Sequence, residues 1–373
     1  MAAVPQPTPM PESPPSDRAM PLDRFDDGRA PLDRSGGGAV PLDVVGMGNA
    51  LVDILAEVPD RVLADLSLVR GSMELVDLRR AEDIYSAVGA AVEVSGGSAA
   101  NTVAGVAALG GASGFVGKIA DDDMGNVFAH DMRASGVELR AAVAGVADGD
   151  AESRGTGRSI IMVTGDAERT MATHLGVSST LCAADVPEDL VARGGVLYLE
   201  GYLWDRPSAK EAMRRAVEIA HDHDRSVALS LSDSFCVERH RKDLLDLVLS
   251  DVDVLFANEE ELRSLFSAGT FDEALADAEE TGVLVAATCG PRGSFVIGGR
   301  GPVEVPAAHA PHVVDKTGAG DMYASGFLYG LTHGSDPVDA AHLGSLCAAA
   351  VIGHLGARPQ HDLAELARAE GFV

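Results

Sequence analysis

The chain has 373 residues, and its 29 Lys and Arg against 57 Asp and Glu give a formal net charge of −28. Phosphate backbones and anionic lipids repel so acidic a chain, which excludes nucleic acid and membrane surfaces from the expected partners. A hydrophobic content of 46% is normal for a globular protein and too high for a disordered one.

The N-terminal region differs in composition from the rest of the chain. Nine of the 18 prolines lie within the first 41 residues, and Pro-Leu-Asp recurs there at a step of ten residues. We therefore expect residues 1–40 to form a disordered, proline-rich tail and residues 41–373 to form the folded domain. No apolar secretory signal is visible, and the four cysteines are too far apart for a zinc cluster or a disulfide framework. We expect a cytoplasmic protein with reduced thiols.

From Leu42 onward, short apolar runs alternate with stretches of helical character. The predicted strands are Val44–Met47, Gly114–Ile119, Val196–Leu199, Val227–Leu231, Val254–Ala257, Val283–Ala287 and Ser294–Ile297. The predicted helices are Ala99–Leu109, Met124–Ser135, Ala209–His221, Asp243–Ser250, Glu259–Phe266, Phe271–Glu280, Ala319–Leu331 and Asp336–Gly353. This alternation is typical of an α/β fold with a doubly wound, mostly parallel sheet and helices on both faces.

One stretch, from about residue 137 to 173, breaks the alternation. It reads as two extended segments, Ser159–Thr164 and Arg169–Thr173, joined by the turn Gly165-Asp166. We expect a small β-rich lid over a site at the carboxyl edge of the sheet, with lid segments roughly within 50–76 and 137–176.

The first motif with chemical potential follows the first predicted strand and reads Val45-Gly46-Met47-Gly48-Asn49-Ala50-Leu51-Val52-Asp53. A strand ends in glycines and then presents Asn49 and Asp53, which suits hydrogen bonding to sugar hydroxyls. A helix cap or a turn is the structural alternative for Asp53. A dinucleotide-binding fingerprint needs a third glycine, which this stretch lacks.

The second motif reads Ser95-Gly96-Gly97-Ser98-Ala99-Ala100-Asn101-Thr102. Its paired glycines let a ligand approach the backbone closely. Ser98 is a suitable N-cap for the helix that follows, and such a helix start directs backbone N–H groups at a ligand. A purely structural glycine-rich helix start is the alternative.

The third motif reads Val314-Asp315-Lys316-Thr317-Gly318-Ala319-Gly320-Asp321. Its Gly-Ala-Gly run opens a helix, so successive backbone amides converge and form an anion hole. Asp321 lies at the same helix mouth, where a carboxylate is placed to take a proton from a hydroxyl that attacks a bound phosphorus. An acid that only complements the helix dipole is the alternative.

The second and third motifs resemble the two signature motifs of the ribokinase-like (PfkB) family of sugar and nucleoside kinases. They lie about 220 residues apart in the expected order, and the resemblance covers the chain from about Leu42 to its end. Within the family the chain is similar to adenosine kinase-type members, through residues 48–53, 165–171 and 200–205. The resemblance implies a ribokinase-like fold with a small β-rich lid.

The resemblance also implies roles for individual residues. Asp321 is then the general base, and the amides of Gly318, Ala319 and Gly320 hold the transferring phosphoryl group. The positions that match the acceptor-binding residues are Asn49, Asp53, Gly96, Gly97 and Asn101.

The nucleotide side of the site is implied in the same way. Asn258 and Glu261 match an Asn-x-x-Glu motif that organises Mg²⁺ and its waters, with a solvated first helical turn as the alternative. Three residues match the turn that shapes the ATP pocket, namely Thr288, Gly290 and Gly293. Cys347 lies on a helix that would flank adenine, with ordinary core packing as the alternative.

The resemblance also bears on a candidate cation site and on two basic residues. Some family members bind K⁺ beside the anion hole, and the matching positions here are Asp315, Thr317 and the region around Gly356. Lys316 departs from the family, which usually has an uncharged residue there, and either supplements the anion hole or faces solvent. Arg169, on the predicted lid, either reaches a phosphate or forms a surface ion pair.

The expected activity is in-line transfer of the ATP γ-phosphoryl group to the 5′-hydroxyl of a nucleoside, with adenosine to AMP as first choice. A kinase for a free sugar (ribose, fructose or a sugar acid) is the main alternative. A non-catalytic nucleotide-binding regulator is the third reading. The expected partners are ATP and a small-molecule acceptor, and the chain is expected to be a monomer or a homodimer.

Overall fold

The computed structural model describes residues 40–145, 153–166, 168–299 and 301–372. The predicted tail lies outside the described residues, apart from Val40. No helix in the described part of the chain is long and apolar enough to cross a membrane.

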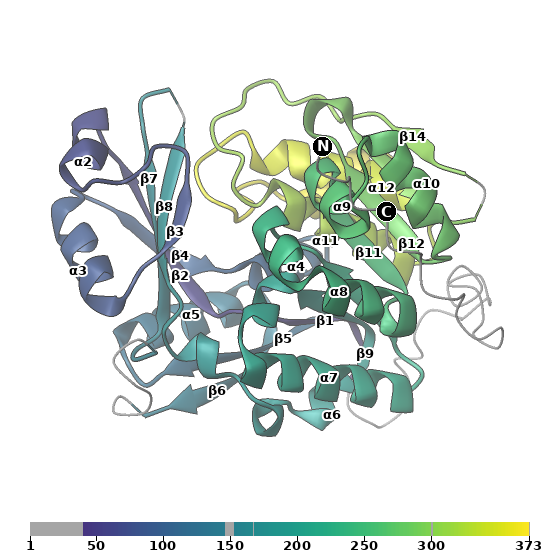
Figure 1. Ribbon diagram of the computed structural model, residues 1–373, viewed down its shortest axis with the longest axis horizontal. Coiled ribbons are helices and arrows are strands. Elements are labelled where there is room, and N and C mark those ends of the chain that lie inside the picture. The colour runs from purple at the N-terminus through teal and green to yellow at the C-terminus, as the bar shows by residue number, and fades with distance from the viewer. Residues whose placement is uncertain (1–39, 146–152, 167, 300, 373) are drawn as a thin grey trace, which may run out of the picture.

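The larger of two sheets has nine strands and forms the centre of the molecule (Figure 1). In spatial order its strands are β14 (Val303–Val305), β13 (Ser294–Ile297), β12 (Leu284–Thr288), β11 (Val254–Asn258), β10 (Ser226–Ser230), β9 (Gly194–Glu200), β1 (Leu42–Met47), β5 (Ser113–Ala120) and β6 (Glu138–Ala144). The strands from β6 to β12 pair in parallel, and β13 and β14 add antiparallel at one edge. This order confirms the predicted doubly wound, mostly parallel sheet.

Helices cover both faces of this sheet, because successive residues of a strand point to opposite sides. In β9, Val196 and Tyr198 join one core cluster and Leu197 and Leu199 join the other. The first cluster includes residues of α4 (Ser98–Ala108), α5 (Asp123–Ala134), α11 (Ala319–Thr332), α12 (Pro337–Val351) and α13 (Leu363–Ala369). The second includes residues of α6 (Glu188–Val191), α7 (Pro207–Asp222), α8 (Ser234–Asp251), α9 (Glu259–Phe266) and α10 (Phe271–Glu280).

The smaller sheet has five strands and stands at one side of the larger one (Figure 1). In spatial order its strands are β3 (Met73–Leu75), β8 (Arg169–His174), β7 (Gly157–Val163), β2 (Leu51–Glu57) and β4 (Val92–Gly96). Its outer face is covered by α2 (Asp60–Asp65) and α3 (Leu78–Ala87). The other elements within the described residues are the 3₁₀ helices η1 (Gly176–Thr180), η2 (Ala183–Asp185), η3 (Gly201–Asp205) and η4 (Gly290–Arg292).

Three expectations need correction. Residues 137–145 were expected with the lid, but β6 pairs in parallel with β5 and therefore extends the larger sheet. Asp53 does not lie at the edge of the first strand, nor in a turn or helix cap, since it sits within β2 of the smaller sheet. Ser98 is the first residue of α4 rather than its cap, because Gly97 occupies the N-cap with φ +96°.

Candidate active site

A cleft of about 1000 Å³ lies between the smaller sheet and the carboxyl edge of the larger one. Residues of β2, β3, β7 and β8 line one side. The segments that follow β9 to β12, together with the starts of α4 and α11, line the other. In doubly wound folds, ligands bind at this edge, where loops leave the carboxyl ends of the strands.

Asp321 lies in the first turn of α11 and is held by two side chains of α4. Its Oδ1 accepts a hydrogen bond from the Ser98 hydroxyl over 2.7 Å, and its Oδ2 accepts one from Nδ2 of Asn101 over 2.9 Å. Each carboxylate oxygen therefore keeps a lone pair for a further donor. Burial raises the pKa of Asp321, against the opposing effect of Asn101, Ser98 and the Arg358 charge.

The N-terminus of α11 opens into the same cleft. Gly318 forms its N-cap with φ +75°, and a side chain there would meet Cβ of Ala357 at 2.5 Å. Gly318, Ala319 and Gly320 all line the cleft. Amides in the first turn of a helix lack acceptors within the helix, which makes this end suited to an anion.

A buried carboxylate, Glu200 at the end of β9, joins the first two motifs. Its Oε1 accepts hydrogen bonds from the backbone and side-chain nitrogens of Asn49, both over 2.7 Å. Its Oε2 accepts the N–H of Ala99, at the start of α4, over 2.9 Å. Burial raises the pKa of Glu200 to about 7. Gly48 is required beside it, because a Cβ there would lie 2.3 Å from Oε2.

Asp53 is buried at the cleft and packs directly on the double-glycine turn. A Cβ on Gly96 would lie 2.2 to 2.4 Å from the atoms of the Asp53 carboxyl, so only glycine fits there. Burial raises the pKa of Asp53 to about 7, while the charge of Arg358 lowers it. Asn101 also lines the cleft, and its buried Oδ1 has no hydrogen-bond partner among the described residues. This oxygen is therefore able to accept a hydrogen bond from a ligand.

Arg358, in the segment after α12, supports this part of the site. Its Nε and Nη2 donate to the carbonyl and hydroxyl of Ser95 over 3.0 Å each, and its Nη1 donates to the carbonyl of Ala100 over 3.1 Å. These bonds fix the backbone on both sides of Gly96 and Gly97. The guanidinium also places a positive charge near Asp53 and Asp321.

The residues predicted for Mg²⁺ form a helix cap at the cleft. Asn258 caps α9, and Glu261 accepts hydrogen bonds from both nitrogens of Asn258 over 2.9 and 2.7 Å. Glu261 is buried rather than solvated, and burial raises its pKa to about 7. One carboxylate and one amide beside the cleft suit Mg²⁺, which keeps several waters and takes its other ligands from phosphate oxygens.

The other predicted nucleotide residues are placed differently. Thr288 and Lys316 line the cleft. Gly290 is exposed at the start of η4, outside the cleft lining. A Cβ on Gly293 would lie 2.0 Å from the Val305 carbonyl oxygen. Glycine at this position therefore allows the chain before β13 to lie close to the end of β14, with which β13 pairs. Cys347 is 1% exposed and packs in the core, which matches the core-packing alternative.

Arg169 extends from β8 to the start of the third motif. Its Nε lies 3.3 Å from Oδ1 of Asp315, and its Nη1 donates to the Thr317 hydroxyl over 2.5 Å. The residues predicted for K⁺ are thus brought together, but with an arginine between them. Arg169 therefore does form an ion pair, but not a surface one, because the Asp315 side chain is fully buried and that of Arg169 is 26% exposed.

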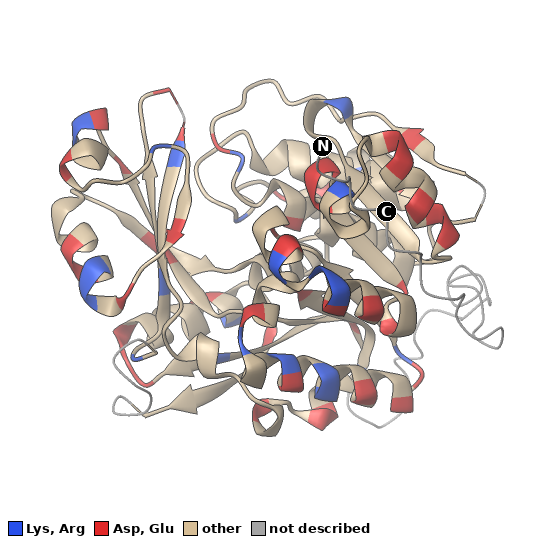
Figure 2. Cartoon of the chain, in the orientation of Figure 1, with Lys and Arg blue, Asp and Glu red and all other residues tan. Residues whose placement is uncertain are grey.

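Positive charge is scarce around the cleft. Among the described residues that line it, the Lys and Arg residues are Arg169, Arg239 and Lys316. Arg239 is paired with Asp205 over 2.7 Å. Acidic residues occupy much of α9, which begins at the cleft, and of α10, which packs against α9 (Figure 2). The positive groups at the cleft are therefore local, namely the N-terminus of α11 and the exposed Lys316, and there is no broad positive field along its described lining.

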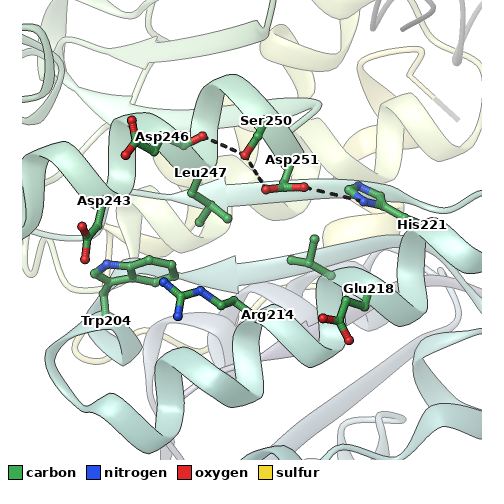
Figure 3. Close-up of a pocket in the computed structure, with 10 residues that line it drawn as sticks. Trp204, Arg214, Glu218, His221, Asp243, Asp246, Leu247, Ser250 and Asp251 are labelled. Carbon is green, nitrogen blue, oxygen red and sulfur yellow. Dashed lines mark hydrogen bonds and ion pairs between the residues drawn. The ribbon is translucent and has the colours of Figure 1, made fainter. Parts of the chain in front are cut away.

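A second hollow, of about 340 Å³, is lined by residues of α7 and α8 and by Trp204 of η3 (Figure 3). Trp204, the single tryptophan, is 1% exposed at its edge, with the Arg214 guanidinium 5.7 Å from the ring centroid. His221 lies 3.8 Å from Asp251 across it. Within the described ranges, no group of three or more His, Cys, Asp or Glu side chains is arranged to hold a metal. None of the predicted site residues lines this hollow, so the large cleft is the candidate site.

The structure adds two site residues to those predicted, Glu200 and Arg358. Glu200 lies in the stretch 200–205 that carries the similarity to adenosine kinase-type members, but the stretch itself does not indicate that this acid joins the first two motifs. Arg358 follows Gly356, and no sequence signal points to its contact with Ser95, which is 263 residues away.

Comparison with known proteins agrees with this geometry. The sequence profile described as pfkB family carbohydrate kinase matches residues 65–363. The crystal structure of adenosine kinase from Sinorhizobium meliloti is 46% identical, with a TM-score of 0.83, over 89% of this chain and all of that one. That of a probable sugar kinase from Rhizobium etli is 44% identical, with a TM-score of 0.84, over 89% of this chain and 99% of that one.

Among relatives known from sequence, 5-dehydro-2-deoxygluconokinase from Bacillus licheniformis is 28% identical over 278 residues, which cover 73% of this chain and 85% of the relative. Nucleoside and sugar kinases thus both occur among the proteins that this chain resembles. The chain belongs to the PfkB family of carbohydrate kinases and is a phosphotransferase that acts on a hydroxyl acceptor.

Proposed function

We propose that this protein transfers the γ-phosphoryl group of ATP to the 5′-hydroxyl of a nucleoside, with adenosine as the first choice. The observation that carries this proposal is a pair of rows, one apolar and one polar, on the cleft face of the smaller sheet. A nucleoside has the matching two parts, a flat apolar base and a polar ribose.

The apolar row crosses three neighbouring strands. Met171 of β8 lies opposite Ile161 of β7 and is paired in register with Met73 of β3. All three side chains line the cleft. Contact with a purine on such a row removes apolar surface from water and favours binding by about 25 cal/mol per Å².

The polar row lies two residues away from the apolar row on β7 and β8, and it continues on β2 instead of β3. Thr173 of β8 is opposite Ser159 of β7, their hydroxyl oxygens are 2.9 Å apart, and Ser159 is in register with Asp53 of β2. Residues two apart on a strand lie about 7 Å apart on the same face. This spacing suits a ribose on the polar row, near Asp53 and Asn101, beside a base on the apolar row.

Charge at the cleft favours a neutral acceptor over a sugar acid. A carboxylate on the acceptor needs a cation with a free donor. Arg169 is engaged with Asp315 and Thr317, and Arg239 is engaged with Asp205. Lys316 adjoins the anion-binding helix start, where the phosphates of ATP are expected. The relation to 5-dehydro-2-deoxygluconokinase nevertheless makes a sugar acid the second candidate acceptor.

The proposed chemistry assigns each group one task. Asp321 accepts the proton of the attacking hydroxyl, while the amides at the start of α11 stabilise the charge of the transferring phosphoryl group. Asp53 and Asn101 orient the acceptor. Mg²⁺, held through Asn258 and Glu261, would neutralise phosphate charge when bound. Asp321 with its two hydrogen-bond donors in place argues against a non-catalytic regulator.

The test is a screen of ADP release with ATP and single acceptors: adenosine, inosine, guanosine, ribose, fructose and 5-dehydro-2-deoxygluconate. We expect adenosine to give the highest kcat/KM, and AMP as the product by chromatography. Turnover with a sugar or a sugar acid and with no nucleoside would overturn the proposal, while leaving the family assignment intact.

Met171→Ala is expected to raise the KM for adenosine about tenfold, because it removes about 1.4 kcal/mol of apolar contact with the base. The KM for ATP should stay unchanged. Met124→Ala is the matched control, since Met124 is also half-buried but lies on α5, outside the cleft lining. Equal effects of the two substitutions on the KM for adenosine would contradict the placement of the base.

A pH dependence follows from Asp53, whose pKa is raised to about 7 by burial. The ionised carboxylate accepts hydrogen bonds from two hydroxyls, whereas the protonated form must donate one. We therefore expect kcat/KM for the acceptor to fall as the pH drops below about 7, with the loss appearing in KM. In the Asp53→Asn variant, the KM should be high at every pH. A wild-type KM that is flat between about pH 6 and 8 would contradict this assignment.

A further inference from the structure

Asp315, in the third motif, has a fully buried carboxylate: its side chain is 0% exposed. A buried carboxylate is stable only when a positive group and hydrogen-bond donors compensate it. The family resemblance suggests K⁺ as that positive group. The contacts of Asp315 test whether a K⁺ ion fits.

Both oxygens of Asp315 accept hydrogen bonds from the protein, and most of these bonds fall on Oδ1. Oδ1 accepts the N–H of Thr317 over 2.9 Å and the Thr317 hydroxyl over 2.6 Å, and Nε of Arg169 lies 3.3 Å from it. Oδ2 accepts the N–H of Gly356 over 2.9 Å. A carboxylate oxygen has about two lone pairs, so Oδ1 has none left for a metal ion.

The Thr317 hydroxyl and a neighbouring carbonyl oxygen are engaged as well. The Thr317 hydroxyl donates to Asp315 and accepts from Nη1 of Arg169. The carbonyl of Ile352, in the adjoining segment, accepts the N–H groups of Val314 and Asp315 over 2.8 and 3.3 Å. K⁺ binds in proteins by exchanging its hydration shell for a set of oxygens directed at it. Asp315 Oδ1, the Thr317 hydroxyl and the Ile352 carbonyl are directed at N–H and O–H groups, so they do not form a set directed at K⁺.

We propose that the guanidinium of Arg169 takes the place of the monovalent cation in this protein, so that its activity does not depend on K⁺. Arginine keeps its charge at every working pH and is more weakly hydrated than an ammonium group. Its Nε and Nη1 bind Asp315 and Thr317 together. The side chain thus compensates the Asp315 charge and holds the turn that leads into the anion-binding Gly318.

The use of Arg169 in place of K⁺ has a structural consequence. A free ion exchanges with solvent, whereas Arg169 is part of β8 and cannot leave. The positive group at the anion-binding turn is therefore supplied by the smaller sheet, so that β8 and the start of α11 are fixed relative to each other. The inference concerns Asp315 and its neighbours and does not depend on which acceptor the enzyme uses.

The test compares the wild type with Arg169→Gln in KCl and in choline chloride at the same ionic strength, about 150 mM. The first readout is the Tm without nucleotide or acceptor, which stays informative if the proposed acceptor is wrong. We expect the wild type to have the same Tm in both salts. In Arg169→Gln the guanidinium charge is missing, and the oxygens of Asp315 and Thr317 that it contacted can bind K⁺ instead. KCl should therefore raise the Tm of the variant by about 2–4 °C over its value in choline chloride.

The second readout is kcat in the same two salts. Wild-type kcat should be equal in both, and the kcat of Arg169→Gln should be low in choline chloride and partly restored by KCl. Arg70→Gln is the matched control, because Arg70 leads into the same sheet and pairs with Asp166, away from Asp315. It should show no preference for KCl. Activation or stabilisation of the wild type by KCl would overturn the proposal.

If Arg169→Gln does not fold, Arg169→Lys replaces it in the same comparison. A single ammonium retains the charge but cannot bind Asp315 and Thr317 through two fixed donors. We expect a lower Tm than that of the wild type and no preference for KCl, since the positive charge is still present. A KCl preference in the Lys variant, or none in a folded Gln variant, would contradict the replacement of the ion by Arg169.

Discussion

Replacing Asp321 by asparagine is expected to lower kcat by about 10²–10⁴-fold, the range that a positioned general base contributes. The amide is close to the carboxylate in shape and still accepts the hydrogen bond of the Ser98 hydroxyl. It cannot, however, take the proton of the attacking hydroxyl. Affinity for ATP should change little, because the α11 amides and Lys316 remain in place.

The pKa of Asp321 adds a second expectation to this experiment. Burial raises it above its ordinary value, and a base acts only when deprotonated. Wild-type kcat should therefore fall on the acid side at a pH above that of an exposed aspartate, and this limb should be absent from the residual activity of Asp321→Asn. The measurement is kcat against pH under saturating ATP and acceptor, with ATP affinity measured by calorimetry.

Asp336→Asn is the matched control for this variant. Asp336 caps α12 by accepting the N–H groups of Val338 and Asp339, and asparagine is an equally good cap. It should leave kcat unchanged. If Asp321→Asn retains more than about a tenth of wild-type kcat, the proton goes elsewhere and the assignment of Asp321 as base is wrong.

The main sheet and its helices were predictable because their signal is local. Every strand predicted in the sequence lies in the nine-stranded sheet or in β7 and β8, and α9 and α10 have the predicted bounds. A strand of a parallel sheet is buried on both faces, so it appears in the sequence as a short, continuous apolar run between helices. The start of α8 was missed, since its first residues lack this regular pattern and a kink occurs at His240.

The smaller sheet was harder to predict. The apolar run of β1 passes into β2 after only three residues that have no regular structure, so the two strands read as one motif. Strands β3 and β4 are short edge strands, and most of their residues are at least partly exposed. The sequence showed that an extended insertion exists, but the strands that pair with it come from distant segments.

The site residues also fall into those that a local motif predicts and those that only long-range contacts bring together. Asp321 and the Gly-Ala-Gly run are contiguous, so their shared role at a helix start is visible in one motif. Glu200 is a single acid at the end of a strand, and its partners Asn49 and Ala99 lie 151 and 101 residues away. Such a contact is created by the sheet order β9–β1 and is not a property of any short stretch.

Replacing Gly97 by alanine is expected to have the largest effect on stability. Gly97 has φ +96°, and a Cβ there would lie 2.2 Å from the backbone carbonyl oxygen of Asn49. Backbone cannot rotate away as a flexible side chain can. Strain at such a φ costs about 1–3 kcal/mol, and overpacking of a tight site costs about as much again. We expect the free energy of unfolding in urea to fall by about 3–5 kcal/mol.

Gly110 provides a control at the other end of the same helix. It follows the C-cap of α4 with φ +94°, and a Cβ there would meet nothing within 4 Å. Gly110→Ala therefore carries the strain of the positive φ without the collision, and it should cost about 1–3 kcal/mol. The difference between the two variants measures the contact with Asn49. Equal losses would mean that the turn can shift and that the collision does not exist in solution.

Activity should separate the two variants even more clearly than stability. A displaced Asn49 carbonyl moves the Asn49 nitrogens that donate to Glu200, and Glu200 also holds the start of α4 at Ala99. The first turn of α4 carries Ser98 and Asn101, which orient Asp321. The folded fraction of Gly97→Ala should therefore show a lower kcat and a higher acceptor KM, since the base and the acceptor site are disturbed together. Gly110→Ala, which leaves this chain of contacts intact, should retain wild-type values of both.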